Sequence, residues 1–157
     1  MPPTSHQKLG KTKKSYARTV ILLDTNVLIY ASTQNSPFEA WSKQIIADAV
    51  VTQGAAVNAI SLAEICVGEN QPEKVADTIR SWGINILDIP AAAAEISAIA
   101  YRDYRKRRHT HSGKDSPITP LPDFFIGAHA QIMGWSLATA DLGRFQTYFP
   151  SVILITP

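Results

Sequence analysis

The sequence predicts a three-layer α/β/α fold, in which helices cover both faces of a mostly parallel sheet of about five strands. Two observations lead to this prediction. Short apolar runs without polar alternation recur along the chain, as is typical of strands buried on both faces. Longer segments with apolar residues at helical spacing separate these runs, and prolines or glycines mark many of their ends. Strands that alternate with helices pair in parallel, because each crossover returns the chain to the same edge of the sheet.

The first half of the chain supplies three predicted strands. The run Val20–Leu23 contains no polar residue, and it ends on Asp24 before a short helical segment. Ser61, with Glu64 three residues later, has the pattern of a capping box at a helix start. In chain order, we predict a strand over 20–23, helices over 25–32 and from Pro37 to Gly54, a strand over 55–60, helices from Ser61 to about Glu69 and from Pro72 to Gly83, and a strand over 84–89.

The second half predicts a longer helix, a loop and two further strands. Pro90 opens a helical segment that leads into the basic run 102–108. The polar segment 110–121 contains prolines and a glycine and predicts a loop, after which Pro122 suits the first position of a helix. The remaining predicted elements are a helix over 122–133, a strand over 135–139, a short helical turn over 141–148 and a strand over 152–155.

Composition predicts one domain over 19–157, preceded by a basic, flexible tail over 1–18 that lacks a hydrophobic period. Hydrophobic residues make up 45% of the chain, which is enough for a core, and no apolar run approaches the length of a membrane span. Cys66 is the only cysteine, so the sequence excludes an intrachain disulfide and a cysteine-based zinc site. Since the sequence shows no secretory signal, we expect a cytoplasmic protein with no membrane partner.

Positive charge is concentrated in two segments. Residues 1–18 hold five basic residues and no acid, and residues 101–114 hold six basic residues and one acid. The rest of the chain carries four basic and twelve acidic residues, although the net charge of the whole is only +2. Basic segments of this kind attract polyanions, but a cationic helix end also complements the helix dipole without any further role.

Acidic residues fall on or near the carboxyl ends of the predicted strands, where ligands bind in open α/β sheets. They are Asp24 after the first strand, Glu64 after the second, Asp123 at the start of the helix before the fourth, and Asp141 after the fourth. Each of them alone could simply cap or charge a helix start. Converging carboxylates, however, repel one another unless a cation lies among them, and oxygen ligands select hard ions such as Mg²⁺ or Mn²⁺.

Four short motifs contain these acids: Leu22–Tyr30 (LLDTNVLIY), Ser61–Ile65 (SLAEI), Leu121–Ala130 (LPDFFIGAHA) and Thr139–Phe145 (TADLGRF). Their order, spacing and predicted element types resemble those of PIN domains, and most of all those of VapC-type ribonuclease toxins of bacterial toxin–antitoxin pairs. The resemblance covers nearly all of the chain outside the tail. At Ala140 the family often has a polar or basic residue, and this departure touches none of the expected ligands.

The resemblance implies a PIN-like fold and a metal-dependent endoribonuclease. In such an enzyme, a bound metal lowers the pKa of its water and stabilises charge on the phosphate, so no Ser, Cys or His nucleophile is needed. The catalytic residues, which would hold one or two Mg²⁺ or Mn²⁺ ions, would be Asp24, Glu64, Asp123 and Asp141.

The resemblance also implies supporting residues and partners. Asn26 and Thr139 are expected to orient the carboxylates, with ordinary roles at a helix start and a strand end as the alternative. RNA such as tRNA is the expected substrate, and a cognate antitoxin and a second copy of the chain are the expected partners. Beside an acidic nuclease site, we interpret the basic run as an RNA contact. Its expected RNA-binding residues are Arg102, Arg105, Lys106, Arg107 and Arg108.

Three other protein classes compete with this interpretation. A phosphoryl-transfer enzyme of the haloacid-dehalogenase type needs a second Asp two residues after the first, where this chain has Asn26. A two-component receiver could use Asp88 as its phosphoacceptor, but the lysine expected after a later strand is missing. A non-catalytic PIN-like module that binds RNA is the strongest rival. Such modules tend to lack one or more of the acids, whereas this chain keeps all four.

Overall fold

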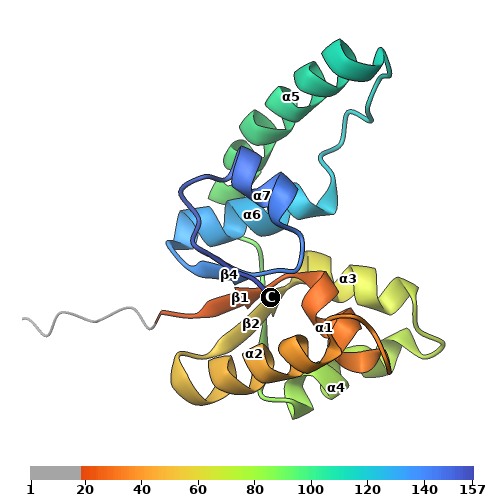
Figure 1. Cartoon of the computed structure of the whole chain (residues 1–157), viewed down its shortest axis with the longest axis vertical. Helices are drawn as coiled ribbons and strands as arrows, with labels where there is room; N and C mark the ends of the chain where they lie inside the picture. Colours follow the sequence, from red (N-terminus) through yellow and green to blue (C-terminus); the bar gives the residue numbers. More distant parts are fainter. Residues whose placement is uncertain (1–18) are drawn as a thin grey trace, which may run out of the picture.

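Residues 19–157 are described by a computed structural model, and the predicted tail over 1–18 lies outside the described residues. The sheet has five strands in the order β3-β2-β1-β4-β5. Every neighbouring pair is parallel, which confirms the predicted parallel sheet (Figure 1). The strands are β1 (Ile21–Leu23), β2 (Ala55–Asn58), β3 (Ile84–Leu87), β4 (Ser136–Ala138) and β5 (Leu154–Ile155).

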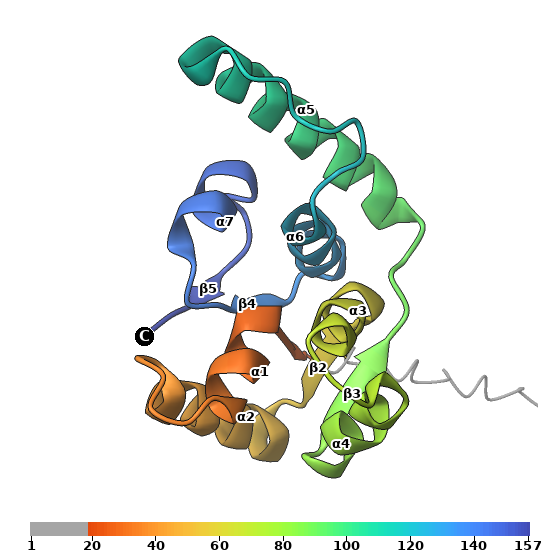
Figure 2. The ribbon, with the colours of Figure 1, turned by 90° about the vertical axis from the view of Figure 1, so that its right-hand side faces the viewer.

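The α-helices of the described chain are α1 (Thr25–Ser32), α2 (Glu39–Thr52), α3 (Ala59–Val67), α4 (Val75–Ser81), α5 (Ala92–Ser112), α6 (Pro122–Met133) and α7 (Leu142–Tyr148). A 3₁₀ turn over Pro72–Lys74 precedes α4. Helices α1, α2 and α4 cover one face of the sheet, and α5, α6 and α7 cover the other (Figure 1). α3 contacts α1 and α4 on one side and α6 on the other, so it bridges the two layers (Figure 2). The predicted three-layer α/β/α arrangement is therefore confirmed.

Two hydrophobic cores form because neighbouring residues of a strand point to opposite faces of the sheet. Ile21 and Leu23 pack into the core under α1, α2 and α4, whereas Leu22 between them packs into the core under α5, α6 and α7. All three residues of β1 are buried. This two-sided burial explains why the predicted strands lack polar alternation.

Aromatic side chains fix α6 in the second core. The Phe124 ring lies 5.1 Å from the ring of Tyr101 and 6.0 Å from that of Phe149, measured between centroids. A Cβ atom at Gly127 would overlap the Phe149 ring, so α6 can lie this close to Phe149 only with glycine at that position. Asp123, the residue before Phe124, is therefore carried by a helix start that the core holds in place.

The boundary between β2 and α3 differs from the prediction. The strand ends at Asn58 and not at residue 60, because the Asn58 side chain caps the helix. Its Oδ1 accepts hydrogen bonds from the backbone N–H groups of Ile60 and Ser61, both at 3.1 Å. Ser61 therefore lies inside the first turn of α3, and the predicted capping box of Ser61 and Glu64 is wrong.

The basic helix is longer than predicted, and several other boundaries shift by a few residues. α5 continues to Ser112, so the first residues of the predicted loop 110–121 are helical. The Thr110 and Ser112 hydroxyls donate to backbone carbonyls four residues earlier, which satisfies these polar side chains within the helix. Strands β3 and β5 are shorter than the predicted 84–89 and 152–155, and α2 begins at Glu39, two residues after the predicted start.

Candidate functional site

Asp24 lies at the centre of the carboxyl edge of the sheet, directly after β1. Its side chain is 3% exposed and makes no capping hydrogen bond to α1, so helix capping does not account for this acid. Instead, the Thr139 hydroxyl donates to Asp24 Oδ2 at 2.7 Å. The Asp24 backbone N–H donates to Ala138 O at 2.9 Å, which extends the β1–β4 pairing to the acid itself.

Glu64 approaches the same edge from α3 and is half-buried. The Thr25 hydroxyl, from the first residue of α1, donates to Glu64 Oε1 at 2.7 Å. Thr25 Oγ1 and Ser61 Oγ are also hydrogen-bonded, at 3.0 Å. Sequence reasoning missed Thr25 as the partner of Glu64 and Ser61 as the partner of Thr25, although both belong to the motifs that carried the resemblance.

Asp123, the second residue of α6, forms an ion pair that the sequence did not predict. Arg144 Nη1 donates to Asp123 Oδ2 at 2.7 Å, and both side chains are half-buried. The Arg144 guanidinium carbon lies 5.4 Å from the centroid of the Tyr104 ring and 5.8 Å from that of Phe124. Because these rings attract a cation, they hold the guanidinium beside the carboxylate. The only signal in the sequence was a basic residue one helical turn after Asp141.

Asp141 is the least fixed of the four acids. It is exposed and occupies the N-cap position of α7, but its side chain makes no capping hydrogen bond. Its backbone N–H donates to Thr139 Oγ1 at 3.0 Å. The Asn26 side chain accepts from the Ala140 backbone N–H at 3.3 Å and donates to Thr139 Oγ1 at 3.4 Å. Asn26 and Thr139 thus tie the loop that carries Asp141 to the start of α1.

The acids influence one another electrostatically. Burial raises the pKa of Asp24 from 3.8 to about 7; the Thr139 hydrogen bond opposes this rise, and the charges of Asp123 and Glu64 add to it. Burial also raises the pKa of Glu64 and of Asp123, although Arg144 lowers that of Asp123. The cost of ionising Asp24 in this setting is the kind of cost that a bound cation relieves.

The donor chemistry of the site fits a hard divalent cation, because every candidate ligand is a carboxylate oxygen. Over residues 19–157, no three His, Cys, Asp or Glu side chains are close enough to hold a metal ion as they stand. The Arg144 guanidinium acts here as a stand-in cation, since it already neutralises Asp123. The residues brought together are therefore suited to a cation, with Asp123 turned toward the positive charge that the chain itself provides.

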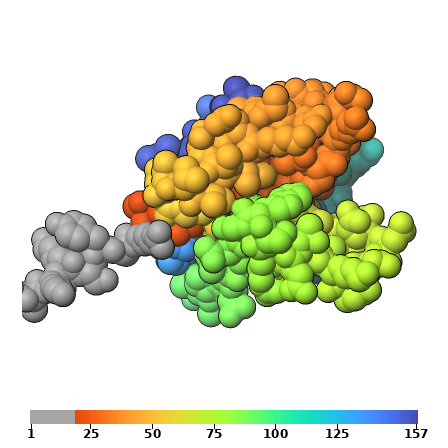
Figure 3. Space-filling view, turned by 90° about the horizontal axis from the view of Figure 1, so that it is seen from below, coloured from red at the N-terminus to blue at the C-terminus, as the bar shows by residue number. Residues whose placement is uncertain are grey.

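A largely apolar groove adjoins the acidic edge. It has a volume of about 610 Å³ and lies between α1, α3 and α4, on the side of the molecule where these helices meet (Figure 3). Leu28, Ile65 and Trp82 are among its lining residues, and Glu64 lies at its border with the acidic edge. Ile29 is 46% exposed there and Trp82 is 39% exposed.

The basic run lies on the last turns of α5, where the structure divides its residues into two sets. Arg107 Nε pairs with Asp103 at 3.0 Å, and Arg108 Nη1 donates to the Tyr104 hydroxyl at 2.9 Å. The other expected RNA-binding residues line a separate pocket against the segment after α5 and are Arg102, Arg105 and Lys106.

None of the helices in the described part of the chain is long and apolar enough to cross a membrane.

Comparisons with known proteins agree with the fold. A family model described as PIN domain matches residues 21–148. Among solved structures, a DNA-bound VapBC from Salmonella typhimurium is 21% identical with a TM-score of 0.61, and covers 88% of this chain and 98% of its own. A toxin–antitoxin complex from Klebsiella pneumoniae is 24% identical with a TM-score of 0.57, over 87% and 96% of the two chains. FitAcB from Neisseria gonorrhoeae is 25% identical with a TM-score of 0.55, over 87% and 97%. Among curated proteins, none has a sequence that matches this chain.

Proposed function

Because the chain belongs to the PIN domain family, we propose that it is a divalent-metal-dependent endoribonuclease, which hydrolyses phosphodiester bonds of RNA as the toxin of a type II toxin–antitoxin pair. The observation that carries this proposal is the electrostatic coupling of Asp24, Glu64 and Asp123 at one edge of the sheet. Glu64 on α3 and Asp123 on α6 have no structural reason to approach the buried carboxyl group of Asp24 closely enough to raise its pKa. A cation bound among them gives that reason.

The proposed division of labour follows the hydrogen bonds. Asp24 and Glu64 are ligands, each held by the hydroxyl of a threonine, and Asp123 and Asp141 complete the set. Thr139 and Thr25 orient the carboxylates and leave their remaining oxygen lone pairs available. A bound Mg²⁺ or Mn²⁺ supplies the Lewis acidity that activates water and stabilises charge on the phosphate.

Cleavage of defined RNAs tests the proposal. Purified protein is incubated with a single-stranded RNA and with a tRNA in EDTA, in Mg²⁺ and in Mn²⁺, and the products are resolved on a denaturing gel. We expect cleavage in either ion and none in EDTA. RNA binding without cleavage under every condition would identify the rival, a non-catalytic RNA-binding module, and neither binding nor cleavage would remove both.

We further propose that a small antitoxin binds in the groove between α1, α3 and α4. The solved structures with a similar fold include a toxin–antitoxin complex. The groove exposes apolar side chains and reaches Glu64, so a segment lying in it would also reach the acidic edge. The test co-expresses the product of the reading frame next to this gene. The co-expressed product should suppress RNA cleavage by the wild-type protein. The Ile29→Asp variant should cleave RNA even when that product is present.

A homodimer is also proposed, from the family resemblance. Light scattering of the purified protein should give twice the 17.2 kDa mass of the chain. A monomer at micromolar concentration would contradict this part of the proposal and leave the catalytic part untouched.

A further inference from the structure

The end of α5 extends beyond the buried part of the helix. Its last buried residue is Tyr101, and none of residues 102–112 is buried. Figures 1 and 2 show this end of the helix projecting past α6 and α7. Gly113 ends the helix in the left-handed region, with φ 63°, and residues 114–121 lead back to the start of α6. We call residues 102–121 the arm.

The arm is tied to the fold near the acidic edge. The Tyr101 hydroxyl donates to the Pro117 carbonyl oxygen at 2.7 Å, which joins the helix to the returning segment. The returning segment then enters α6 at Pro122, one residue before Asp123. A ligand held on the arm is therefore held by the same chain segment that positions a candidate metal ligand.

Only part of the arm's positive charge has a partner in the described part of the chain. The Asp103 carboxylate neutralises Arg107, whose guanidinium carbon also lies 5.6 Å from the centroid of the Tyr148 ring. Over residues 19–157, the side chains of Arg102, Arg105 and Lys106 make no ion pair. These three share one side of the helix, because they are three and four residues apart.

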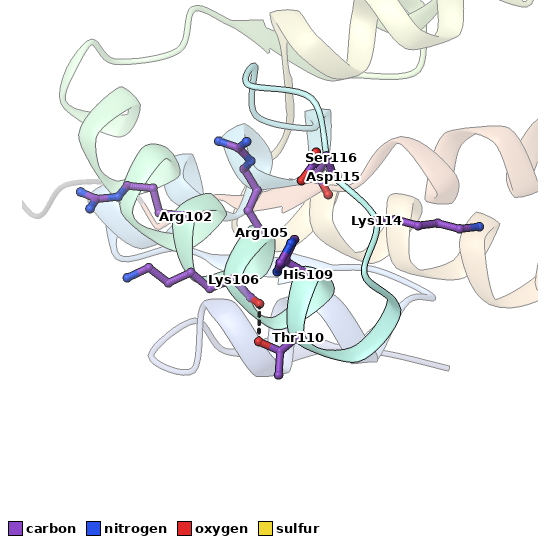
Figure 4. Close-up of a pocket in the computed structure, with 8 residues that line it drawn as sticks. All are labelled: Arg102, Arg105, Lys106, His109, Thr110, Lys114, Asp115 and Ser116. Carbon is purple, nitrogen blue, oxygen red and sulfur yellow. Dashed lines mark hydrogen bonds between the residues drawn. The ribbon is translucent and has the colours of Figure 1, made fainter.

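The unpaired cations line a pocket of about 430 Å³ between the helix and the returning segment. Figure 4 shows Arg105 and His109 on the side of the helix near Ser116 and Asp115, whereas the Lys114 side chain points outward from the returning segment. Ser116 is only 9% exposed, and its buried Oγ has no hydrogen-bond partner among residues 19–157. An unpartnered buried hydroxyl costs free energy, and a ligand oxygen would satisfy it. The complete lining is Arg102, Arg105, Lys106, His109, Thr110, Lys114, Asp115 and Ser116.

We propose that the arm pocket binds a backbone phosphate of RNA, away from the bond that is cut. Permanent positive charges outnumber the single carboxylate of Asp115 in the lining, so the pocket attracts an anion. The pocket lies at the carboxyl end of α5, and the dipole of a helix repels anions at that end. The attraction therefore comes from the side chains alone. The proposal rests on the proposed function for the identity of the anion and deepens it by adding a second contact to the same RNA. Arg107 and Arg108, in this view, stabilise the arm and do not bind RNA.

Two matched double variants test the arm pocket. Arg105→Gln/Lys106→Gln removes two charges from the pocket, and Arg107→Gln/Arg108→Gln removes two charges from the same helical turns outside it. Affinity for a labelled single-stranded RNA is measured in EDTA at several salt concentrations, so the result does not depend on cleavage. The pocket double should lower the slope of log affinity against log salt concentration by roughly 0.7, which is the contribution of one lost phosphate contact on a single strand. The control double should leave the slope unchanged and lower the melting temperature.

Two further measurements complete the experiment. Ser116→Ala should weaken RNA binding roughly threefold with no change in slope, because it removes a hydrogen bond and no charge. Inorganic phosphate should compete with RNA in the wild type and lose this effect in the pocket double. Equal slope changes in the two doubles, or phosphate binding with RNA affinity unchanged in the pocket double, would overturn the proposal. Pocket-dependent RNA binding without any cleavage would instead overturn only the proposed catalytic function.

Discussion

The strand ends that carry Asp24 and Asp141 are neighbours in the sheet but hold their acids in opposite ways. Asp24 follows β1 directly, is 3% exposed, and accepts a hydrogen bond from Thr139. Asp141 lies in the loop after β4, is exposed, and its side chain makes no capping hydrogen bond. The comparison teaches that position at a sheet edge does not fix a side chain, and that burial and a dedicated hydrogen-bond donor do.

The register of the two strands produces this difference. Leu23 pairs with Ala138, so the next residue of each strand, Asp24 and Thr139, lie side by side. Thr139 therefore takes the position opposite the central acid and donates to it, while Asp141 falls two residues further along. In the proposed site, Asp24 is the fixed ligand and Asp141 is the adjustable one.

The largest expected effect comes from the fixed acid. Asp24→Asn should lower RNA cleavage at least about 100-fold, because it removes charge from the centre of the site with little change in shape. Asp88→Asn is the matched control, since Asp88 also follows a strand directly but is exposed at the edge strand β3. Initial cleavage rates in Mg²⁺ measure both. A folded Asp24→Asn protein with the activity of Asp88→Asn would contradict the assignment.

The same acid should make the stability of the metal-free protein depend on pH. The pKa of Asp24 is about 7 in the fold and 3.8 as its ordinary value, so the folded state binds the proton more tightly. The free energy of unfolding in EDTA should therefore fall as pH rises from about 4 to 7, by up to about 4 kcal/mol from this group. Asp24→Asn should lose that part of the slope in urea unfolding at pH 5 and pH 8. Burial lowers the pKa of His129, which gives a slope of opposite sign, but both proteins share it.

Sequence patterns predicted what depends on short segments of chain. The buried strand before Asp24 and the helix opened by Pro122 are visible in a few consecutive residues, and both form as predicted. The start of α3 was not predictable in this way, because Asn58 and Ser61 are both good capping residues. The sheet selects Asn58 as the cap, because Asn58 forms the last pair of β2 with β3, opposite Leu87, and α3 begins at the next residue.

Contacts between distant segments were beyond the sequence. The Arg144–Asp123 ion pair joins residues 21 positions apart and depends on rings from α5 and α6 that hold the guanidinium. The division of the basic run also depends on tertiary structure, because Tyr148 from α7 lies under Arg107. From the number of charges alone, every basic residue of the run 102–108 was expected to bind RNA.

A smaller effect is expected from Arg144, which fixes Asp123 as Thr139 fixes Asp24. Arg144→Gln should tighten Mn²⁺ binding by several-fold, because it removes a positive charge that neutralises a candidate ligand. Arg80→Gln is the control, since Arg80 pairs with an exposed acid on α4. Calorimetric titration with Mn²⁺ measures binding directly, without RNA. Unchanged or weaker binding in Arg144→Gln would show that the ion pair does not compete with a metal for Asp123.

The smallest effect is expected at Asp141, and it tests the comparison itself. Because the Asp141 side chain makes no capping hydrogen bond, neither Asp141→Asn nor Asp141→Ala should show the loss of about 1 kcal/mol that follows removal of a formed cap. Both should retain the melting temperature of the wild type and lose several-fold activity in Mg²⁺ through the missing charge. High Mn²⁺ should restore part of that activity, since Mn²⁺ generally binds such sites more tightly. If both variants cleave RNA as the wild type does across a Mg²⁺ titration, the site has three carboxylates and Asp141 is not a ligand. A stability loss confined to Asp141→Ala would instead return Asp141 to the role of a helix cap.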